Sequence, residues 1–344
     1  MPNEIPQKMP AYRFPRANGI DTLELHDVPV PIPGRGQILV RMRAASLNYR
    51  DLNVAAGRAA RGTLPDNLVP LSDGAGEVAR VGPGVSRVNP GDRVAGLFMQ
   101  SWLGGEIEPS HVDSSRGGSI DGVLAEYVLF DQDGVISIPQ HLSFEEGATL
   151  PCAGVTAWNA LYAGRSLRTG ETVLVLGTGG VSIFALQFAH AAGARVIATS
   201  SSDAKLARAK ALGASDGINY RQHAEWHEQV LALTGGRGVD HVVEVGGAGT
   251  LGRSVEATRL GGQVHLIGVL TGGEINPTPI LRRNILLRGI YVGSRQMFEA
   301  MNAAIGLHQI HPVIDRVFAF DQAREAYHYM KGQVHVGKVV IRIA

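Results

Sequence analysis

The sequence contains one cysteine, Cys152, among its 344 residues. A single thiol excludes an internal disulfide framework and any zinc site that needs two or more cysteine ligands. It suits a reducing compartment, and we expect a cytoplasmic location. The first ten residues lack the apolar segment of a secretory signal. No stretch approaches the ~20 apolar residues of a membrane helix, so no membrane association is expected.

An excess of charge of one sign is also lacking. The 32 Lys and Arg residues balance the 31 Asp and Glu residues, and the basic residues are dispersed along the chain. The sequence therefore has no cluster of basic residues that would bind nucleic acid, and the expected partner is a small molecule. The hydrophobic content of 44% is typical of a soluble globular protein, and the length allows two domains.

The chain has two segments with different patterns of apolar residues. Residues 11 to about 130 contain short strand-like runs separated by turns such as PIPGRG and NPGD, which predicts mostly β structure. Between 151 and 298, the apolar runs TVLVLG, VIATSS, HVVEVG and VHLIGV alternate with helix-length segments. This alternation predicts an α/β domain with a doubly wound parallel sheet. The tail from 299 contains an amphipathic stretch and a last strand, GKVVIRI, that could pair back into the first domain, residues 1–150.

The segment VLVLGTGGVS has the sequence pattern of a dinucleotide-binding turn. Gly177 can form the tight turn after the strand, and Gly179 lets the backbone approach a pyrophosphate at the start of the next helix. The strand, turn and helix context makes this pattern more specific than glycines alone. The predicted cofactor-binding turn consists of Gly177, Thr178, Gly179, Gly180 and Val181.

The end of the next strand favours NADPH over NADH. An NAD site usually has an acidic residue about 20 residues beyond the loop, whereas this chain has Ser200 and Ser201, followed by Lys205. Hydroxyls and an ammonium suit a 2′-phosphate, which a carboxylate would repel. Asp203 complicates this prediction, and the same serines could also cap the following helix.

Several segments in one order resemble the medium-chain dehydrogenase/reductase superfamily, specifically its zinc-free quinone-oxidoreductase-like branch. They are AASLNYRDL, PLSDGAGEVARVGPGVSRVNPGDRV, ATLPCAGVTAWNAL, LGTGGVS, LGAS with INY, VVEVGG and GKVVIRI. The resemblance implies a GroES-like catalytic domain, residues 1–150 and 299–344, and a Rossmann cofactor-binding domain, residues 151–298. It also implies a homodimer joined through a Rossmann edge strand near 285–293.

The resemblance also identifies where zinc-dependent members hold their catalytic metal. Asn48, Ser72 and Cys152 occupy the three ligand positions, and only the last is a zinc-binding residue type. One thiol cannot supply the three protein ligands of such a site, so no metal is expected. His111 with Asp113 offers too few ligands, and the pair His223 and His227 is interpreted as the solvated face of a polar helix.

Without a metal, hydrogen-bond donors must stabilise the negative charge that develops on the acceptor. Asn48 and Tyr49 are the candidate catalytic residues. By resemblance, Tyr49 can polarise a carbonyl or donate a proton, and Asn48 can orient the substrate. Alternatively, Tyr49 only shapes the wall of the pocket. Arg50 and Asp51, in the same motif, could equally form a structural ion pair rather than take part in catalysis.

The resemblance implies further contacts to the cofactor from strand ends and from the tail. These residues are Thr156, Tyr220, Gly246, Gly247, Ile267, Gly268, Val269, Leu270, Val292, Gly293, Ser294 and Lys338.

The expected function is NADPH-dependent, zinc-independent hydride transfer to a small conjugated carbonyl compound or a quinone. Two alternatives remain open from the sequence. One is an NADP-dependent alcohol or aldehyde oxidoreductase, and the other is a non-catalytic NADPH-binding sensor or structural protein.

Overall fold

The computed structural model describes residues 5–59 and 61–343, which fold into two compact units. The first unit contains residues up to 155 and from 293 onward, and the second contains residues 156–292. The division falls a few residues from the expected boundaries at 150 and 299. Within the described ranges, no helix has the length and apolar composition needed to cross a bilayer.

The first unit is built on a seven-stranded sheet with the order β14-β15-β3-β4-β5-β7, in which β6 also pairs with β3. Its strands are β3 (Gln37–Leu47), β4 (Asp73–Val81), β5 (Arg93–Gly96), β6 (Tyr127–Asp131), β7 (Val135–Ser137), β14 (Ile314–Ala319) and β15 (Lys338–Arg342). A separate antiparallel pair consists of β1 (Lys8–Arg13) and β2 (Glu24–Pro29).

Helices of 4 to 14 residues connect these strands. They are α1 (Tyr49–Ala55), α2 (Pro109–Val112), α3 (Phe144–Gly147), α10 (Arg295–His308) and α11 (Ala323–Lys331), with 3-10 turns at Ile20–Thr22, Gln132–Gly134 and Phe320–Gln322. A π-helical turn, Leu150–Gly154, precedes α4 (Val155–Tyr162), so the helix-like stretch around Cys152 is not one regular helix.

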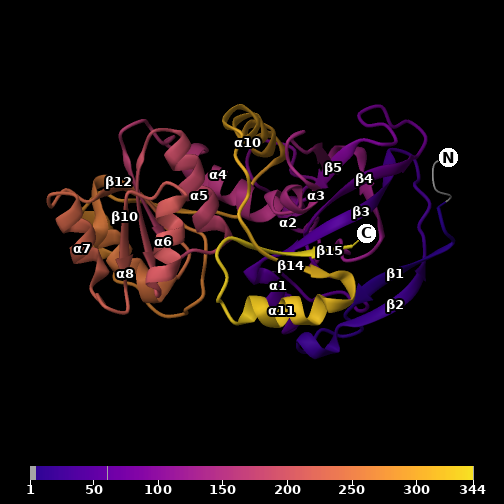
Figure 1. Ribbon diagram of the computed structural model, residues 1–344, viewed down its shortest axis with the longest axis horizontal. Coiled ribbons are helices and arrows are strands. Elements are labelled where there is room, and N and C mark those ends of the chain that lie inside the picture. Colours follow the sequence, from indigo (N-terminus) through magenta and orange to yellow (C-terminus); the bar gives the residue numbers. More distant parts are fainter. Residues whose placement is uncertain (1–4, 60, 344) are drawn as a thin grey trace. The chain divides into compact units, whose positions relative to one another are not determined.

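Two segments far apart in the sequence lie side by side in this sheet, the indigo strand β3 and the yellow strand β15 (Figure 1). The strands are antiparallel, with Val339 opposite Leu47. This register brings Lys338, the first residue of β15, opposite Asn48, which follows β3. Val339 and Ile341 are fully buried, so their packing in the core holds β15 in this register.

The second unit contains a six-stranded parallel sheet with the order β10-β9-β8-β11-β12-β13. The strands are β8 (Thr172–Leu176), β9 (Arg195–Ser200), β10 (Asp216–Asn219), β11 (Val239–Glu244), β12 (Thr258–Leu266) and β13 (Leu286–Gly289). This is the strand order of a Rossmann fold. Successive strands are added on one side of β8 up to β10, and on its other side from β11 onward. Ligands of such sheets bind at the carboxyl ends of the strands beside this change of side.

Helices cover the sheet of the second unit. They are α5 (Gly180–Ala191), α6 (Asp203–Ala211), α7 (Trp226–Leu233), α8 (Ala248–Ala257) and α9 (Thr278–Arg282). Every residue of β8 and β11 is buried, which explains why these strands read as apolar runs rather than alternating ones. The expected Rossmann fold and mostly β domain are therefore both present.

Candidate functional site

The turn after β8 has an open backbone suited to a pyrophosphate. Gly177 has φ +69°, a left-handed conformation that favours glycine. Gly179 is the N-cap of α5, and no atom lies within 4 Å of the position where its Cβ would be. The helix begins at Gly180, so its first N–H groups, which have no acceptor within the helix, lie at this turn.

The rest of the predicted turn is closely packed. Thr178 is buried, and Val181 is the second residue of α5. Ser182 stands where the Rossmann pattern has Gly or Ala, and its hydroxyl donates to the carbonyl of Leu176 at 2.7 Å. That bond ties the helix start to the end of β8, so the serine is compatible with the turn.

The end of β9 holds the residues predicted to select NADPH. Ser200 is the last residue of the strand and is buried, whereas Ser201 and Lys205 are half-buried. Tyr220, 42% exposed, donates its backbone N–H to the carbonyl of Ser200 at 3.0 Å. The structure therefore brings Tyr220 to the serine segment.

Asp203, the residue that complicated the choice of cofactor, is engaged by two side-chain amides. Its carboxylate accepts from Asn219 Nδ2 at 2.8 Å and from Gln222 Nε2 at 3.1 Å. Sequence reasoning missed Arg221, an exposed cation that directly follows Tyr220. Only the pairing of β10 with β9, which sets Asn219 beside Ser200, brings that cation to this region.

The glycines after β11 are bound to an internal carboxylate. Glu244 is fully buried, and its Oε1 accepts from the N–H groups of Gly246 at 2.7 Å and Gly247 at 3.1 Å. Thr250 and Ser254 donate their hydroxyls to the same carboxylate. These two amides are therefore already satisfied, so a cofactor contact there would use other atoms of the glycines.

The segment after β12 is held near β11 and then becomes exposed. Ile267 and Gly268 both donate to the carbonyl of Glu244, and a Cβ on Gly268 would overlap the carbonyl of Val245. The close approach of the Val245 carbonyl alone explains why position 268 is glycine, without any contact to a cofactor. Val269 is 77% exposed and Leu270 is 45% exposed, so both present apolar surface to solvent.

The remaining predicted cofactor contacts lie on helix and strand termini. Thr156 is buried at the start of α4, and Val292 has a left-handed φ of +55° and accepts from Asn159 Nδ2. Gly293 packs against Val155, and Ser294 is the N-cap of α10, its hydroxyl accepting from Met297.

In the first unit, Lys338 and Asn48 form a buried contact. Lys338 is 3% exposed, and its Nζ donates to Asn48 Oδ1 at 2.5 Å and to the carbonyl of Leu47 at 2.6 Å. Asn48 is 7% exposed, and its Nδ2 has no hydrogen-bond partner among the described residues. Lys338, predicted as a cofactor contact, therefore also belongs to the candidate catalytic group.

Tyr49 follows as the first residue of α1 and is 38% exposed. Asp51 accepts from the backbone N–H of Asn48 at 2.7 Å and forms the expected ion pair with Arg50, at 3.5 Å. Burial raises the pKa of Asp51 to about 6 despite the neighbouring guanidinium of Arg50. These contacts fix the start of α1 and leave the ring of Tyr49 partly open to solvent.

Asp73, which sequence reasoning passed over, completes this group. The residue is fully buried, and its carboxylate accepts from the Ser72 hydroxyl at 2.6 Å and from the Cys152 backbone N–H at 3.0 Å. Burial raises the pKa of Asp73, against the opposing effect of the Lys338 ammonium. The pattern Ser-Asp at the start of a buried strand is the signal that could have identified it.

These residues do not fit a tetrahedral zinc site. Two of the three ligand positions hold Asn48 and Ser72, whose oxygens are already bonded to Lys338 and Asp73. Burial raises the pKa of the Cys152 thiol and so opposes the thiolate that a metal needs. An ammonium also lies directly against the first position. Within residues 5–59 and 61–343, no group of three or more His, Cys, Asp or Glu could hold a metal.

The histidines that the sequence singled out have other surroundings. His223 lies in the turn before α7, so the interpretation of His223 and His227 as one helix face was wrong. His227 pairs with Glu256 at 2.9 Å. His111 stacks on Trp102 and accepts from the N–H of Glu108, and Asp113 pairs with Arg61 at 3.7 Å.

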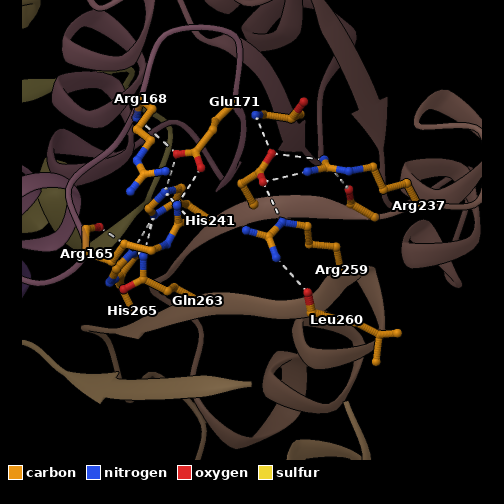
Figure 2. Close-up of polar contacts among 12 residues, drawn as sticks. Arg165, Arg168, Glu171, Arg237, His241, Arg259, Leu260, Gln263 and His265 are labelled. Atoms are coloured by element: carbon orange, nitrogen blue, oxygen red, sulfur yellow. Dashed lines mark hydrogen bonds and ion pairs between the residues drawn. The ribbon is translucent and has the colours of Figure 1, made fainter. Parts of the chain in front are cut away.

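A second buried polar cluster lies in the sheet of the second unit (Figure 2). His241 and His265 stack with Nδ1 and Nε2 3.1 Å apart, and Glu171 lies 3.0 Å from His241 Nε2. Asp240, beside them, accepts from Arg237 and Arg259. Apart from His265, which lies one residue before the end of β12, these residues lie before the strands or in their first halves, and their contacts link neighbouring strands.

Comparisons with known proteins agree with this architecture. Residues 34–140 match the family model of the alcohol dehydrogenase GroES-like domain, and residues 180–306 match that of zinc-binding dehydrogenases. A zinc-type alcohol dehydrogenase-like protein of Schizosaccharomyces pombe is 45% identical over 95% of this chain and 96% of its own. The chain belongs to the medium-chain dehydrogenase/reductase superfamily.

Two further relatives extend this medium-chain dehydrogenase/reductase assignment. A putative alcohol dehydrogenase from Sinorhizobium meliloti 1021 is 40% identical, with a TM-score of 0.93 over 99% of this chain and 100% of its own. The quinone oxidoreductase of Homo sapiens is 27% identical over 97% of both chains. The protein is therefore an oxidoreductase. The matched zinc-binding dehydrogenase segment contains none of the positions 48, 72 and 152.

Proposed function

We propose that this medium-chain dehydrogenase/reductase is NADPH-dependent and zinc-independent, and that it transfers hydride to a small conjugated carbonyl compound or a quinone. The observation that carries the proposal is the buried Lys338–Asn48 contact. It supplies a cation and an amide at the position where zinc-dependent relatives hold a metal ligand. A metal-free site must polarise the acceptor through hydrogen bonds.

The choice of NADPH is supported by the end of β9. Ser200, Ser201 and Lys205 offer hydroxyls and an ammonium, and the Asp203 carboxylate is occupied by two amides. An engaged carboxylate is less available to bind a ribose hydroxyl than a free one. A 2′-phosphate therefore fits this segment better than an unmodified adenosine ribose.

The proposed roles follow from these positions. The turn at Gly177 and Gly179 would hold the pyrophosphate at the start of α5. The reduced nicotinamide supplies the hydride when bound. Asn48 donates a hydrogen bond to the acceptor oxygen, and the hydroxyl of Tyr49 donates a second hydrogen bond or the proton that completes the reduction.

The second candidate function is NADP-dependent oxidation of alcohols or reduction of aldehydes. It is favoured by the names of the two relatives with 45% and 40% identity, which are alcohol dehydrogenase-like. The same donors would serve this reaction, because an aldehyde oxygen also gains negative charge when its carbon receives hydride.

The test is consumption of NADPH and NADH with three acceptor classes, 2-alkenals, quinones and aldehydes, with and without a chelator. We expect faster turnover with NADPH, highest rates with 2-alkenals or quinones, and no loss of activity on chelation. Higher rates with aldehydes alone would favour the second candidate function. Tight NADPH binding without turnover of any acceptor would indicate a non-catalytic sensor or structural protein.

We further propose a homodimer formed through β13. This strand is the edge of the six-stranded sheet, and its Leu286 is 49% exposed. An unpaired apolar edge strand is a template for pairing with a second copy. Leu286→Lys should convert the dimer to monomer in light scattering, and a wild-type monomer would contradict the proposal. The single cysteine fits a reducing compartment, and fractionation of tagged protein tests the proposed cytoplasmic location.

A further inference from the structure

The Lys338–Asn48 contact determines which end of the Asn48 amide faces the ammonium. A lysine ammonium has three donors and no acceptor, so it can bind only the oxygen of a side-chain amide. Lys338 Nζ lies 2.5 Å from Asn48 Oδ1, and its second acceptor is the carbonyl of Leu47. The lysine is 3% exposed, so water does not compete freely for these bonds. The amide of Asn48 therefore has one favoured orientation.

This orientation directs Asn48 Nδ2 away from the lysine, and no residue in the described ranges accepts a hydrogen bond of full geometry from it. The amide faces the Asp73 carboxyl closely enough to lower its pKa, but the contact does not have the geometry of a full hydrogen bond. The Asp73 oxygens instead accept from Ser72 and Cys152. Buried donors in folded proteins are almost always satisfied, so an unsatisfied one beside a candidate active site indicates a missing ligand atom.

We propose that Lys338 is a positioning residue that fixes the Asn48 amide so that Nδ2 donates to the carbonyl oxygen of the hydride acceptor. The inference deepens the proposed function and rests on it. When the acceptor carbon gains a hydride from NADPH, the electron pair of the carbonyl moves to oxygen, and the amide stabilises the resulting negative charge. A proton from Tyr49 or water then completes the reduction, and NADP⁺ is released.

Asn48→Asp tests the donor while keeping an oxygen for Lys338. We expect kcat to fall about 10²-fold, the usual effect of removing one preorganised donor, with the Kd for NADPH changed less than threefold. Asn53→Asp is the matched control, because it adds the same charge to α1, and the contact that the structure describes for the Asn53 side chain is with Arg58 at the protein surface. This control should keep the wild-type kcat. Retention of kcat in Asn48→Asp would overturn the proposal.

Lys338→Met tests the orientation. We expect a smaller loss of kcat than in Asn48→Asp, because an unrestrained amide still presents Nδ2 in one of its two orientations. Lys338→Arg, whose side chain also carries donors only, should restore part of the loss. A weaker Kd for NADPH with unchanged kcat would show that Lys338 binds the cofactor instead, and would overturn the proposal.

A measurement independent of turnover separates this inference from the proposed function. In protein labelled with ¹⁵N at asparagine, the Asn48 side-chain amide is assigned as the signal that Asn48→Asp removes. We expect two distinct, exchange-protected proton resonances that shift in Lys338→Met. Resonances that do not shift would overturn the inference even in an active enzyme. Shifted resonances in a protein that reduces no acceptor would contradict only the proposed function.

Discussion

The stability of the second unit should decrease at acidic pH because His265 is buried in a neutral form. Burial, followed by the nearby His241, lowers the pKa of His265 to about 3 from its usual 6.5. Below pH 6.5 the unfolded chain therefore binds a proton that the folded protein does not. The stabilisation is fully present above pH 6.5 and is lost as the pH falls toward about 3, by about 1.4 kcal/mol per pH unit within that window.

Between pH 7 and pH 5 this one group should reduce the free energy of unfolding by about 2 kcal/mol. The change is measured by urea denaturation at both pH values, followed by tryptophan fluorescence, because Trp226 is buried in α7 of the second unit. His265→Gln removes the titrating group. Between pH 7 and pH 5, the free energy of unfolding of this variant should therefore fall by about 2 kcal/mol less than that of the wild type. Titrating groups that do not contact His265 are common to both proteins and cancel in the difference.

The comparison uses the change with pH, so any constant destabilisation of His265→Gln does not affect it. His223→Gln, at an exposed position in the turn before α7, is the matched control and should follow the wild type. Equal pH dependence of His265→Gln and wild type would refute the reasoning, because it would mean that His265 takes up its proton in the folded state.

Three further predictions test the cofactor and the chemistry. Lys205→Ala should raise the Kd for NADPH about tenfold, the effect of one charge-assisted hydrogen bond, and leave that for NADH unchanged; equal wild-type affinities for both would contradict the assignment. Tyr49→Phe should lower kcat by about 10²-fold if the hydroxyl acts in the transition state, and an unchanged rate would make the ring a pocket wall. Incubation with a chelator should leave activity unchanged, whereas one tightly held zinc per chain in purified protein would disprove zinc independence.

Much of the fold could be predicted because local sequence and tertiary structure agree. The strands around Val173, Ile197 and Val242 are buried, so their apolar runs were a reliable signal of a covered parallel sheet. The turn at Gly177 was recognisable because its left-handed φ requires glycine at one fixed place. Both features depend on a few neighbouring residues.

Features that depend on tertiary contacts could not be predicted from local sequence. The spacing of His223 and His227 matched one helix turn, but α7 begins only at Trp226. The glycines after β11 resembled cofactor contacts, yet Glu244 already binds their amides. A glycine in a sequence shows that backbone approaches closely, and it does not show whether a ligand or another part of the protein occupies that position.

The candidate catalytic group shows the same limit most clearly. Asn48 and Ser72 reveal from sequence that two metal ligands are missing, but they do not reveal what balances the buried carboxylate of Asp73. The structure brings Lys338, 290 residues from Asn48 along the chain, against that asparagine through the pairing of β15 with β3, and its ammonium opposes the burial that raises the pKa of Asp73. The buried ammonium is itself satisfied by two oxygens, Asn48 Oδ1 and the carbonyl of Leu47, which offset the cost of its burial. The metal-free chemistry proposed for this protein therefore requires the lysine as much as it requires the loss of the ligands.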